Sequence, residues 1–348
     1  MARPILLLFD NENFREKIAL SVVSKKRIKI IDIRNLEKFP GLKNFEVDLL
    51  CFVDKFVSGS NVKINERGTI LDFFPGQNLV RNVQHNTTSF RSLSYYLEFV
   101  IYLVLMTVNR SEIKLNGIRS TCIDISLENM LYVTIPILRK LGLRDIRFKV
   151  FTNLYSYSWN TELIIFFPNT QIKKQFKLIN PGIINKFRLV NTYSSNNILK
   201  REEIEEFLGR FSLPKNFNLK VLNIRVFNKN FNFQTTSLIT ETTEGCVFGE
   251  DTTFLVRKDK ISNCNKILHN VICSLFEDVN TGSSVDKKNH IFLFLKILNN
   301  GKCNLSSGRL GKLTFLDIKF MRDLKKILGI VFSIKYDIII KSFIVKLA

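Results

Sequence analysis

The stretch LKNFEVDLLCFVDKFVSGSNVKINERGTILDFF, residues 42–74, decides the fold class of the chain. Its first half spaces apolar side chains as an amphipathic helix does, at Phe45, Leu49, Phe52, Val53 and Phe56. Its second half contains two strand-like runs, NVKINE and TILDFF, which a short Arg-Gly turn joins. A helix that leads directly into a hairpin predicts a mixed α/β unit.

The neighbouring residues extend this unit and repeat it. A helix over residues 14–23 and a strand over residues 27–33 make the order helix, strand, helix, strand, strand. The order returns as a helix over 91–106, a strand over 112–118, a helix over 126–142, and strands in IRFKVFT and ELIIFF. A third copy starts at residues 286–298, continues through a helix over 317–328, and ends in GIVFSI and DIIIKSFIV. Three such βαβαββ-type units predict a repeat-built α/β (α+β) architecture.

A segment between the second and third copies breaks this rhythm. It reads as a strand in NKFRLVNTY, a charged helix in ILKREEIEEFLGRF, a strand in LKVLNIRVF and a helix in SNCNKILHNVICSLFEDV. We expect an inserted smaller α/β module here. The predicted division is residues 1–182 for repeats 1 and 2, 183–278 for the insert, and 279–348 for repeat 3, which completes the main domain.

The charge balance indicates the class of partner. The 348 residues hold 52 Lys and Arg against 31 Asp and Glu, a formal net charge of +21. Such an excess favours a polyanionic partner, RNA or DNA, because phosphate neutralisation dominates this kind of binding. A lysine-rich composition that merely keeps the surface soluble is the alternative interpretation.

The sequence gives little support for a membrane protein, a disulfide-stabilised protein or a zinc-binding protein. The apolar run within residues 85–110 is cut by Glu98 and is too short to span a bilayer. The apolar ILLLF near the start lacks the cleavage pattern of a signal peptide, so we expect a chain on the cytosolic or nuclear side. The six cysteines form no C-x-x-C pair, which predicts reduced, buried thiols rather than a zinc site or disulfide framework.

Eight segments follow one another in the order known from one family. They are NFREK, KRIKI, FPGLKNFEVDLL, FFPG, FRSLSYYLE, NPGIINKFR, TETTEGC and LTFLDIKFMRDLKK. Together they resemble the RNA 3′-terminal phosphate cyclase superfamily, and more closely the cyclase-like branch that works in eukaryotic small-subunit ribosome assembly. The resemblance covers nearly the whole chain and implies the family fold of three repeats plus an insert.

The resemblance also shows where the chain departs from an active cyclase. Cyclases carry a glycine-rich N-terminal loop with a glutamate and an arginine, and a late histidine that becomes adenylylated. Here the loop is FDNENF, without glycine, and only Arg15 matches the family's arginine. Asn44 and Glu98 replace glutamines, and residues 306–320 contain no histidine. The resemblance therefore implies a pseudoenzyme without cofactor or metal, with a vestigial pocket of Arg15, Asn44, Arg91, Glu98 and His290.

Three alternatives stay open at this point. An active ATP-dependent cyclase would need a relocated nucleophile, either His290, near the family's Asp-Gln pair, or His85. An endoribonuclease would need a general base or a carboxylate cluster for metal, and no D-x-D or H-x-E cluster is present. A retained phosphate site would use Arg91 with the start of the helix that follows it.

Two dense basic segments are candidates for contacts with RNA or protein, against plain solvation. The residues are Lys25, Lys26 and Arg27 in SKKRIKI, and Arg322, Lys325 and Lys326 in RDLKK. The resemblance implies a non-catalytic structural component of the small-subunit processome in the nucleolus of the nucleus, acting in 18S-type precursor rRNA processing and 40S-type subunit assembly. It also implies three kinds of partner, namely precursor ribosomal RNA, a processome GTPase and other small-subunit assembly factors. Arg322 is the residue expected to face the GTPase.

Overall fold

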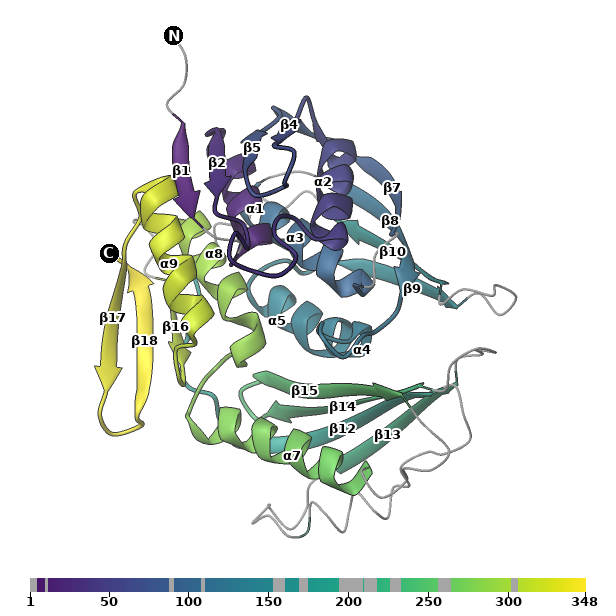
Figure 1. Cartoon of the computed structure of the whole chain (residues 1–348). Helices are drawn as coiled ribbons and strands as arrows, with labels where there is room; N and C mark the ends of the chain where they lie inside the picture. The colour runs from purple at the N-terminus through teal and green to yellow at the C-terminus, as the bar shows by residue number, and fades with distance from the viewer. Residues whose placement is uncertain are drawn as a thin grey trace.

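The computed structural model describes residues 5–9, 12–87, 91–107, 110–152, 160–168, 175–193, 209, 218–225, 233–255, 264–301 and 306–348. Helices and strands alternate and form several mixed sheets (Figure 1), so the predicted α/β class is confirmed. Among the described residues, no helix has both the length and the hydropathy needed to cross a membrane.

The first unit contains the stretch that decides the fold. Its elements are β1 (Leu6–Phe9), α1 (Phe14–Ser24), β2 (Ile28–Ile31), α2 (Asn44–Phe56), β4 (Asn61–Ile64) and β5 (Leu71–Phe74). A two-stranded ribbon of β3 (Val57–Ser58) and β6 (Asn78–Leu79) lies beside them. The predicted helix and hairpin are confirmed, and Leu49, Phe52 and Phe56 of α2 are fully buried. The first strand, β1, was not predicted.

The second unit follows the same order. It consists of β7 (Asn82–Asn86), α3 (Leu93–Met106), β8 (Ser111–Ile118), α4 (Leu127–Asn129), the π-helical turn η1 (Met130–Thr134), α5 (Ile135–Lys140), β9 (Arg147–Thr152) and β10 (Asn160–Phe167). The helix predicted over residues 126–142 is thus interrupted by a π-turn. Pro136 lacks the N–H that would bond the Tyr132 carbonyl in an α-helix, and Ile135 N–H bonds back to Met130 instead.

The last sheet is built from both sides of the insert. Its elements are β11 (Lys177–Leu178), then the short 3₁₀ turn η3 (Lys287–Asn289), α8 (His290–Asn300), β16 (Ser307–Leu310), α9 (Phe315–Leu328), β17 (Phe332–Asp337) and β18 (Ser342–Leu347). Within the described residues, three sheets share one topology, with orders β1-β2-β5-β4, β7-β8-β10-β9 and β11-β16-β18-β17. In each sheet the first two strands are parallel and the other pairs antiparallel.

A fourth sheet lies below α4 and α5 in Figure 1. It has the order β13-β12-β14-β15, from β12 (Ile184–Tyr193), β13 (Asn218–Arg225), β14 (Phe233–Thr242) and β15 (Val247–Leu255), and α7 (Cys264–Asn280) covers its outer face. Phe187, Leu238 and Phe248 of the sheet pack in one buried cluster with Ile272 and Leu275 of α7. The helix predicted in ILKREEIEEFLGRF lies outside the described residues apart from residue 209.

The inner face of this sheet approaches η1 closely. A Cβ on Gly249 of β15 would lie 2.4 Å from Val133 Cγ2, so only glycine permits the contact. Asn129 Nδ2 donates to the Gly249 carbonyl at 3.1 Å in the same place. The insert is therefore packed tightly against the second unit near β15.

Helix α3 runs through the middle of the main body. Nearly all of its side chains are buried, and it contacts α1 on one side and α8 on another. The rings of Tyr102 in α3 and Phe292 in α8 lie 5.5 Å apart, centroid to centroid. The apolar run within residues 85–110 is thus a strand followed by a buried helix.

Candidate functional site

Arg15 and Glu98, two of the predicted pocket residues, meet between α1 and α3. Arg15 Nη1 forms an ion pair with Glu98 Oε2 and donates to the Tyr95 carbonyl at 3.2 Å. The two side chains are only 18% and 11% exposed. Burial raises the pKa of Glu98, although Arg15 acts in the opposite direction. Arg15 is thus paired with a carboxylate of the chain.

Arg91 is tied down in a similar way at the start of α3. Its guanidinium lies 4.3 Å from the ring centroid of Tyr95 and 4.7 Å from that of Phe45. Its Nε donates to Asp124 Oδ1 at 2.7 Å, and the backbone N–H of Ser92 donates to Asp124 Oδ2 at 2.8 Å. Asp124 therefore takes the place at this helix N-terminus that a phosphate would need. No pattern in the sequence identified Asp124 as this partner.

The other two predicted pocket residues lie elsewhere. Asn44 is exposed at the first turn of α2. His290 begins α8 and is 2% exposed, and its Nδ1 lies 2.8 Å from Asp317 Oδ2. Asp317 also accepts the backbone N–H of Thr314 at 2.7 Å and so caps α9. His290 thus connects α8 to α9 and is not part of the Arg15 cluster.

The remaining two histidines are also engaged. His85 is 3% exposed, with Nε2 3.3 Å from Asp48 Oδ1 and its ring 5.3 Å from that of Phe52. His269 is exposed on α7, where a ring nitrogen lies 3.7 Å from Cys273 Sγ. Since His85 and His290 are both buried, neither ring presents a nitrogen to a nucleotide in solvent.

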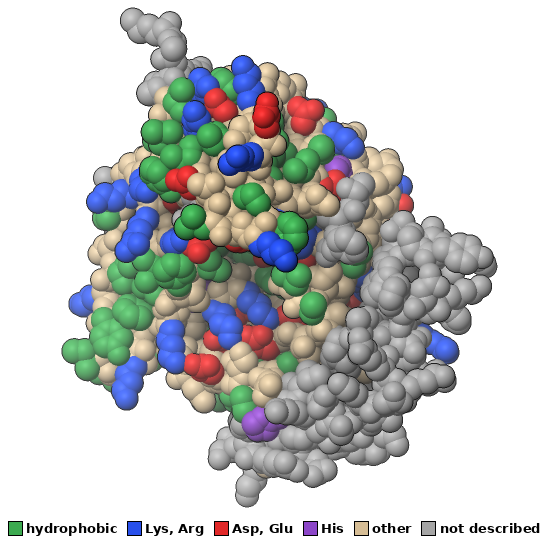
Figure 2. Space-filling view, in the orientation of Figure 1, with side chains coloured by type: hydrophobic (Ala, Val, Ile, Leu, Met, Phe, Trp, Pro, Cys, Tyr) green, Lys and Arg blue, Asp and Glu red, His purple; other side chains and the backbone are tan. Residues whose placement is uncertain are grey.

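The predicted basic segments divide into two groups. Arg322, Lys325 and Lys326 are exposed on α9, and Lys26 donates to the Ile327 carbonyl at 2.6 Å at the end of that helix. Figure 2 shows Lys and Arg side chains, with hydrophobic ones among them, on the face that carries α9. A hollow of about 140 Å³ lies here, lined by Phe9, Lys17, Lys319, Arg322, Asp323 and Lys326.

The other two basic residues contact the first unit. Lys25 donates to the Gly76 carbonyl at 3.0 Å. Arg27 forms an ion pair with Asp72 and lies 4.0 Å from the ring centroid of Phe74. These two side chains hold α1 and β2 against β5 and its following turn.

A charged network joins the insert to the main body. Lys288 Nζ lies 2.6 Å from Glu250 Oε2 and 2.5 Å from Asp251 Oδ1, and Lys287 Nζ lies 2.8 Å from Glu250 Oε1. Asp251 Oδ2 also accepts the backbone N–H of Ser126 at 2.6 Å. Within the part of the chain that is described, no three His, Cys, Asp or Glu side chains form a cluster that could hold a metal ion.

The cysteines differ from the expectation. Cys246 is buried as expected, whereas Cys51, Cys122 and Cys273 are exposed, so the prediction of buried thiols is wrong for these three. Cys51 lies on the outer side of α2, where the amphipathic spacing points its neighbours Leu49 and Phe52 inward.

Comparison with known proteins identifies relatives along most of the chain. The family model of RNA 3′-terminal phosphate cyclase matches residues 11–334. A probable RNA 3′-terminal phosphate cyclase-like protein of Arabidopsis thaliana is 27% identical, over 97% of this chain and 94% of its own. The cyclase-like protein of Homo sapiens is 26% identical, over 92% and 87%. The rRNA processing protein RCL1 of Saccharomyces cerevisiae is 30% identical, over 39% of this chain and 37% of its own.

Proposed function

Because the chain belongs to the RNA 3′-terminal phosphate cyclase family, we propose that it is a non-catalytic member that acts in the processing of precursor ribosomal RNA. The observation that carries the proposal is the closure of the family pocket. Arg15 is neutralised by Glu98, and Asp124 fills the anion position beside Arg91. Two negative charges in these places oppose the binding of a triphosphate or of an RNA 3′-phosphate.

The proposed role as a structural component is supported by the exposed basic surface of α9. A non-catalytic protein acts by docking, and its basic α9 surface offers charge to precursor rRNA or to an acidic protein face. In this proposal the chain is a component of the small-subunit processome in the nucleolus. Arg322, Lys325 and Lys326 on α9 contact the partner GTPase, and the insert of residues 183–278 is a separate module.

Catalysis is tested by labelling. Purified protein is incubated with ATP labelled on the α-phosphate, with and without 3′-phosphorylated RNA, beside an active cyclase as positive control. We expect no acid-labile AMP adduct on this chain, because His85 and His290 are buried and His269 lies on α7, which covers the outer face of the fourth sheet (Figure 1). A stoichiometric adduct that mass spectrometry maps to His290 or His85 would overturn the non-catalytic assignment.

Docking is tested by a matched pair of triple variants. Arg322→Ala, Lys325→Ala and Lys326→Ala on α9 are compared with Lys335→Ala, Lys341→Ala and Lys346→Ala on the β17–β18 hairpin, which are also exposed. Both sets remove three positive charges. We expect only the α9 set to lose co-purification with the GTPase and to accumulate unprocessed 18S-type precursor in cells. Equal behaviour of the two sets would contradict α9 as the docking surface.

A further inference from the structure

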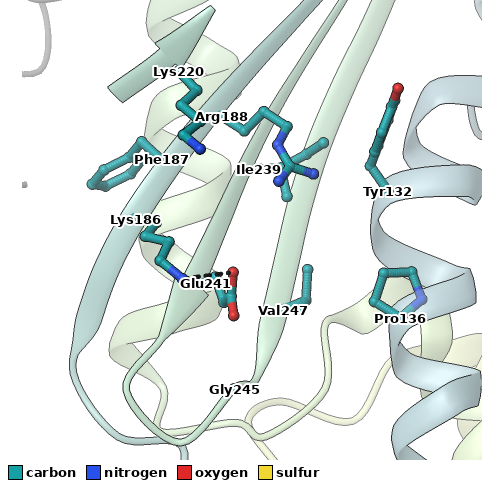
Figure 3. A pocket seen from close by; sticks show the side chains of 10 residues that line it. All are labelled: Tyr132, Pro136, Lys186, Phe187, Arg188, Lys220, Ile239, Glu241, Gly245 and Val247. Atoms are coloured by element: carbon teal, nitrogen blue, oxygen red, sulfur yellow. Dashed lines mark ion pairs between the residues drawn. The ribbon is translucent and has the colours of Figure 1, made fainter. Parts of the chain in front are cut away.

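A basic groove lies between the insert and the second unit, beside the close contact of Gly249 with Val133, because its lining residue Ile239 is the register partner of Gly249. Its volume is about 330 Å³. Figure 3 shows Tyr132 and Pro136 on one wall, from η1 and α5, and Arg188 extending toward them from β12 on the other. No sequence pattern marks these side chains as a group, because they meet only when the insert packs on the helix.

Two cations of the groove come from neighbouring strands of the sheet. Arg188 of β12 and Lys220 of β13 are register partners in a parallel pair, so both side chains lie on the same face of the sheet. Like charges opposite each other destabilise a sheet. Lys186 has a partner, since its Nζ lies 3.7 Å from Glu241 Oε2. Within the described residues, neither Arg188 nor Lys220 has a carboxylate partner. An anion between them would remove the repulsion.

The opposite wall supplies a flat aromatic surface. Tyr132 is partly exposed, and the guanidinium of Arg188 lies 5.4 Å from its ring centroid. Tyr132 sits in the π-helical turn, a feature that often occurs at functional sites. Cations beside an aromatic ring are the usual composition of sites for single-stranded nucleic acid, in which bases stack and phosphates bind the charges.

The size of the groove favours one nucleotide over a larger ligand. A volume of about 330 Å³ is at the lower end of the range of about 300–1,000 Å³ for ligand pockets. A double helix cannot enter such a groove, whereas an unstacked base from a single strand can. Ile239 and Val247 give the groove an apolar floor suited to a base.

We propose that this groove binds single-stranded RNA, with a phosphate between Arg188 and Lys220 and the adjoining base against Tyr132. The choice of RNA rests on the proposed function in precursor rRNA processing, whereas the position rests on the geometry of the groove. An acidic peptide would satisfy the two cations but would leave the aromatic wall unused.

The experiment measures RNA binding by the full chain. A fluorescent oligouridylate of about ten nucleotides is titrated with wild type and with Arg188→Gln/Lys220→Gln. The control is Lys335→Gln/Lys346→Gln, which removes the same charge from exposed positions on β17 and β18. We expect the groove variant to bind about tenfold more weakly than the control, and its slope of log K against log salt to be smaller by about 1.4.

Two further measurements separate a groove site from general attraction to a basic protein. Ultraviolet crosslinking to the uridines should map to Tyr132, and Tyr132→Phe should keep the affinity that Tyr132→Leu loses. Because Arg188 and Lys220 repel each other, the groove variant should also melt at the same or a higher temperature than wild type. A loss of RNA binding is then not a loss of fold.

The outcomes distinguish this proposal from the proposed function. Equal affinity of groove variant and control, or equal competition by polyglutamate and single-stranded RNA, would overturn the groove as an RNA site. The proposed function would be unaffected by that result, because it is tested separately by the level of 18S-type precursor in cells that lack the chain. Normal processing without the chain would instead overturn the proposed function, while the groove could still crosslink RNA in vitro.

Discussion

At the residue scale, Arg15 and Glu98 form an ion pair between α1 and α3. The sequence pattern matched Arg15 to the family's arginine, and in the structure Glu98 compensates its charge. Removal of only one partner leaves an uncompensated charge in a poorly solvated place, whereas removal of both leaves two apolar side chains that can pack. We therefore expect a single substitution in this pair to destabilise the protein more than the double substitution does.

We expect Arg15→Met to lower the free energy of unfolding by about 3 kcal/mol, and Arg15→Met/Glu98→Leu to recover most of the loss. Urea unfolding of the single and double variants measures both values. Lys114→Met is the control, because Lys114 pairs with Glu162 at the surface, where such a change costs less than about 1 kcal/mol. Equal losses for Arg15→Met and Lys114→Met would show that Arg15 is effectively solvated.

The buried carboxyl group of Asp286 destabilises the folded protein at neutral pH. Burial raises its pKa from 3.8 to about 7, although Asn289 and Lys288 favour its charged form. Its Oδ2 has no hydrogen-bond partner among the described residues, while Oδ1 accepts a bond from Asn289. Between about pH 4 and pH 7 the folded protein holds a proton that the unfolded chain has lost, so stability falls as pH rises through this window.

Asp286→Asn should therefore stabilise the protein at and above neutral pH. Asparagine keeps an acceptor for Asn289 and removes the buried charge, which is worth on the order of 1 to 3 kcal/mol. The gain should shrink to nothing as the pH approaches 4. Melting curves of variant and wild type across this range measure the difference, and a gain that stays constant with pH would contradict a titrating Asp286.

At the scale of elements, the start of α9 combines two roles in one side chain. Thr314 and Asp317 form a capping box, in which each side chain accepts the other's backbone N–H. Asp317 also binds His290 and so attaches α8 to α9. Loss of the cap alone costs about 1 kcal/mol, whereas loss of Asp317 removes the cap and leaves a buried imidazole without its partner.

We expect Thr314→Ala to cost about 1 kcal/mol and Asp317→Ala to cost about 2 kcal/mol more, because a buried polar group left without a partner loses its desolvation compensation. Unfolding in urea gives both values. In the double variant His290→Leu/Asp317→Ala, most of the additional cost should disappear. If Thr314→Ala and Asp317→Ala are equally destabilised, the contact of Asp317 with His290 does not contribute to stability.

The sequence predicted long, periodic elements well and short strands poorly. The apolar spacing of α2 and the clear turn after β4 are local signals, so residues 42–74 were predicted correctly. The strands β1, β7 and β16 were missed, since each has four or five residues and gains its hydrogen bonds from distant neighbours. β14 and β15 were missed because Thr, Gly and charged residues hide their alternation.

The candidate site was less predictable than the fold. Arg15, Glu98 and Arg91 were named from the family pattern, but Asp124 and Tyr95, which contact Arg91, carry no local signal of their partners. His290 was placed in the pocket because of its position along the chain, and only the packing of α8 on α9 shows its attachment to Asp317. Whether a charged side chain is paired or free depends on tertiary contacts, and the spacing of residues along the sequence does not predict these contacts.

At the scale of the whole molecule, ion pairs join the insert to the main body in addition to the packing at Gly249. Lys288 follows the insert in the chain and reaches back to Glu250 and Asp251 of β15. Burial alone would raise the pKa of Glu250, but Lys288 and Lys287 hold it below its ordinary value. We therefore expect these pairs to help fix the position of the insert over η1 and the shape of the basic groove.

Lys288→Met should loosen the insert before it unfolds the protein. Asp251 then loses its cation and Glu250 keeps only Lys287, which also pairs with Asp278, and this change is expected to cost about 3 kcal/mol. Hydrogen exchange should accelerate in β15 and α4, which meet at this network, while α3 in the main core stays protected. Lys312→Met is the control, because Lys312 pairs with Glu277 in solvent and its loss should leave exchange unchanged. Uniform acceleration that includes α3 would mean that the insert and the main body unfold as one cooperative unit.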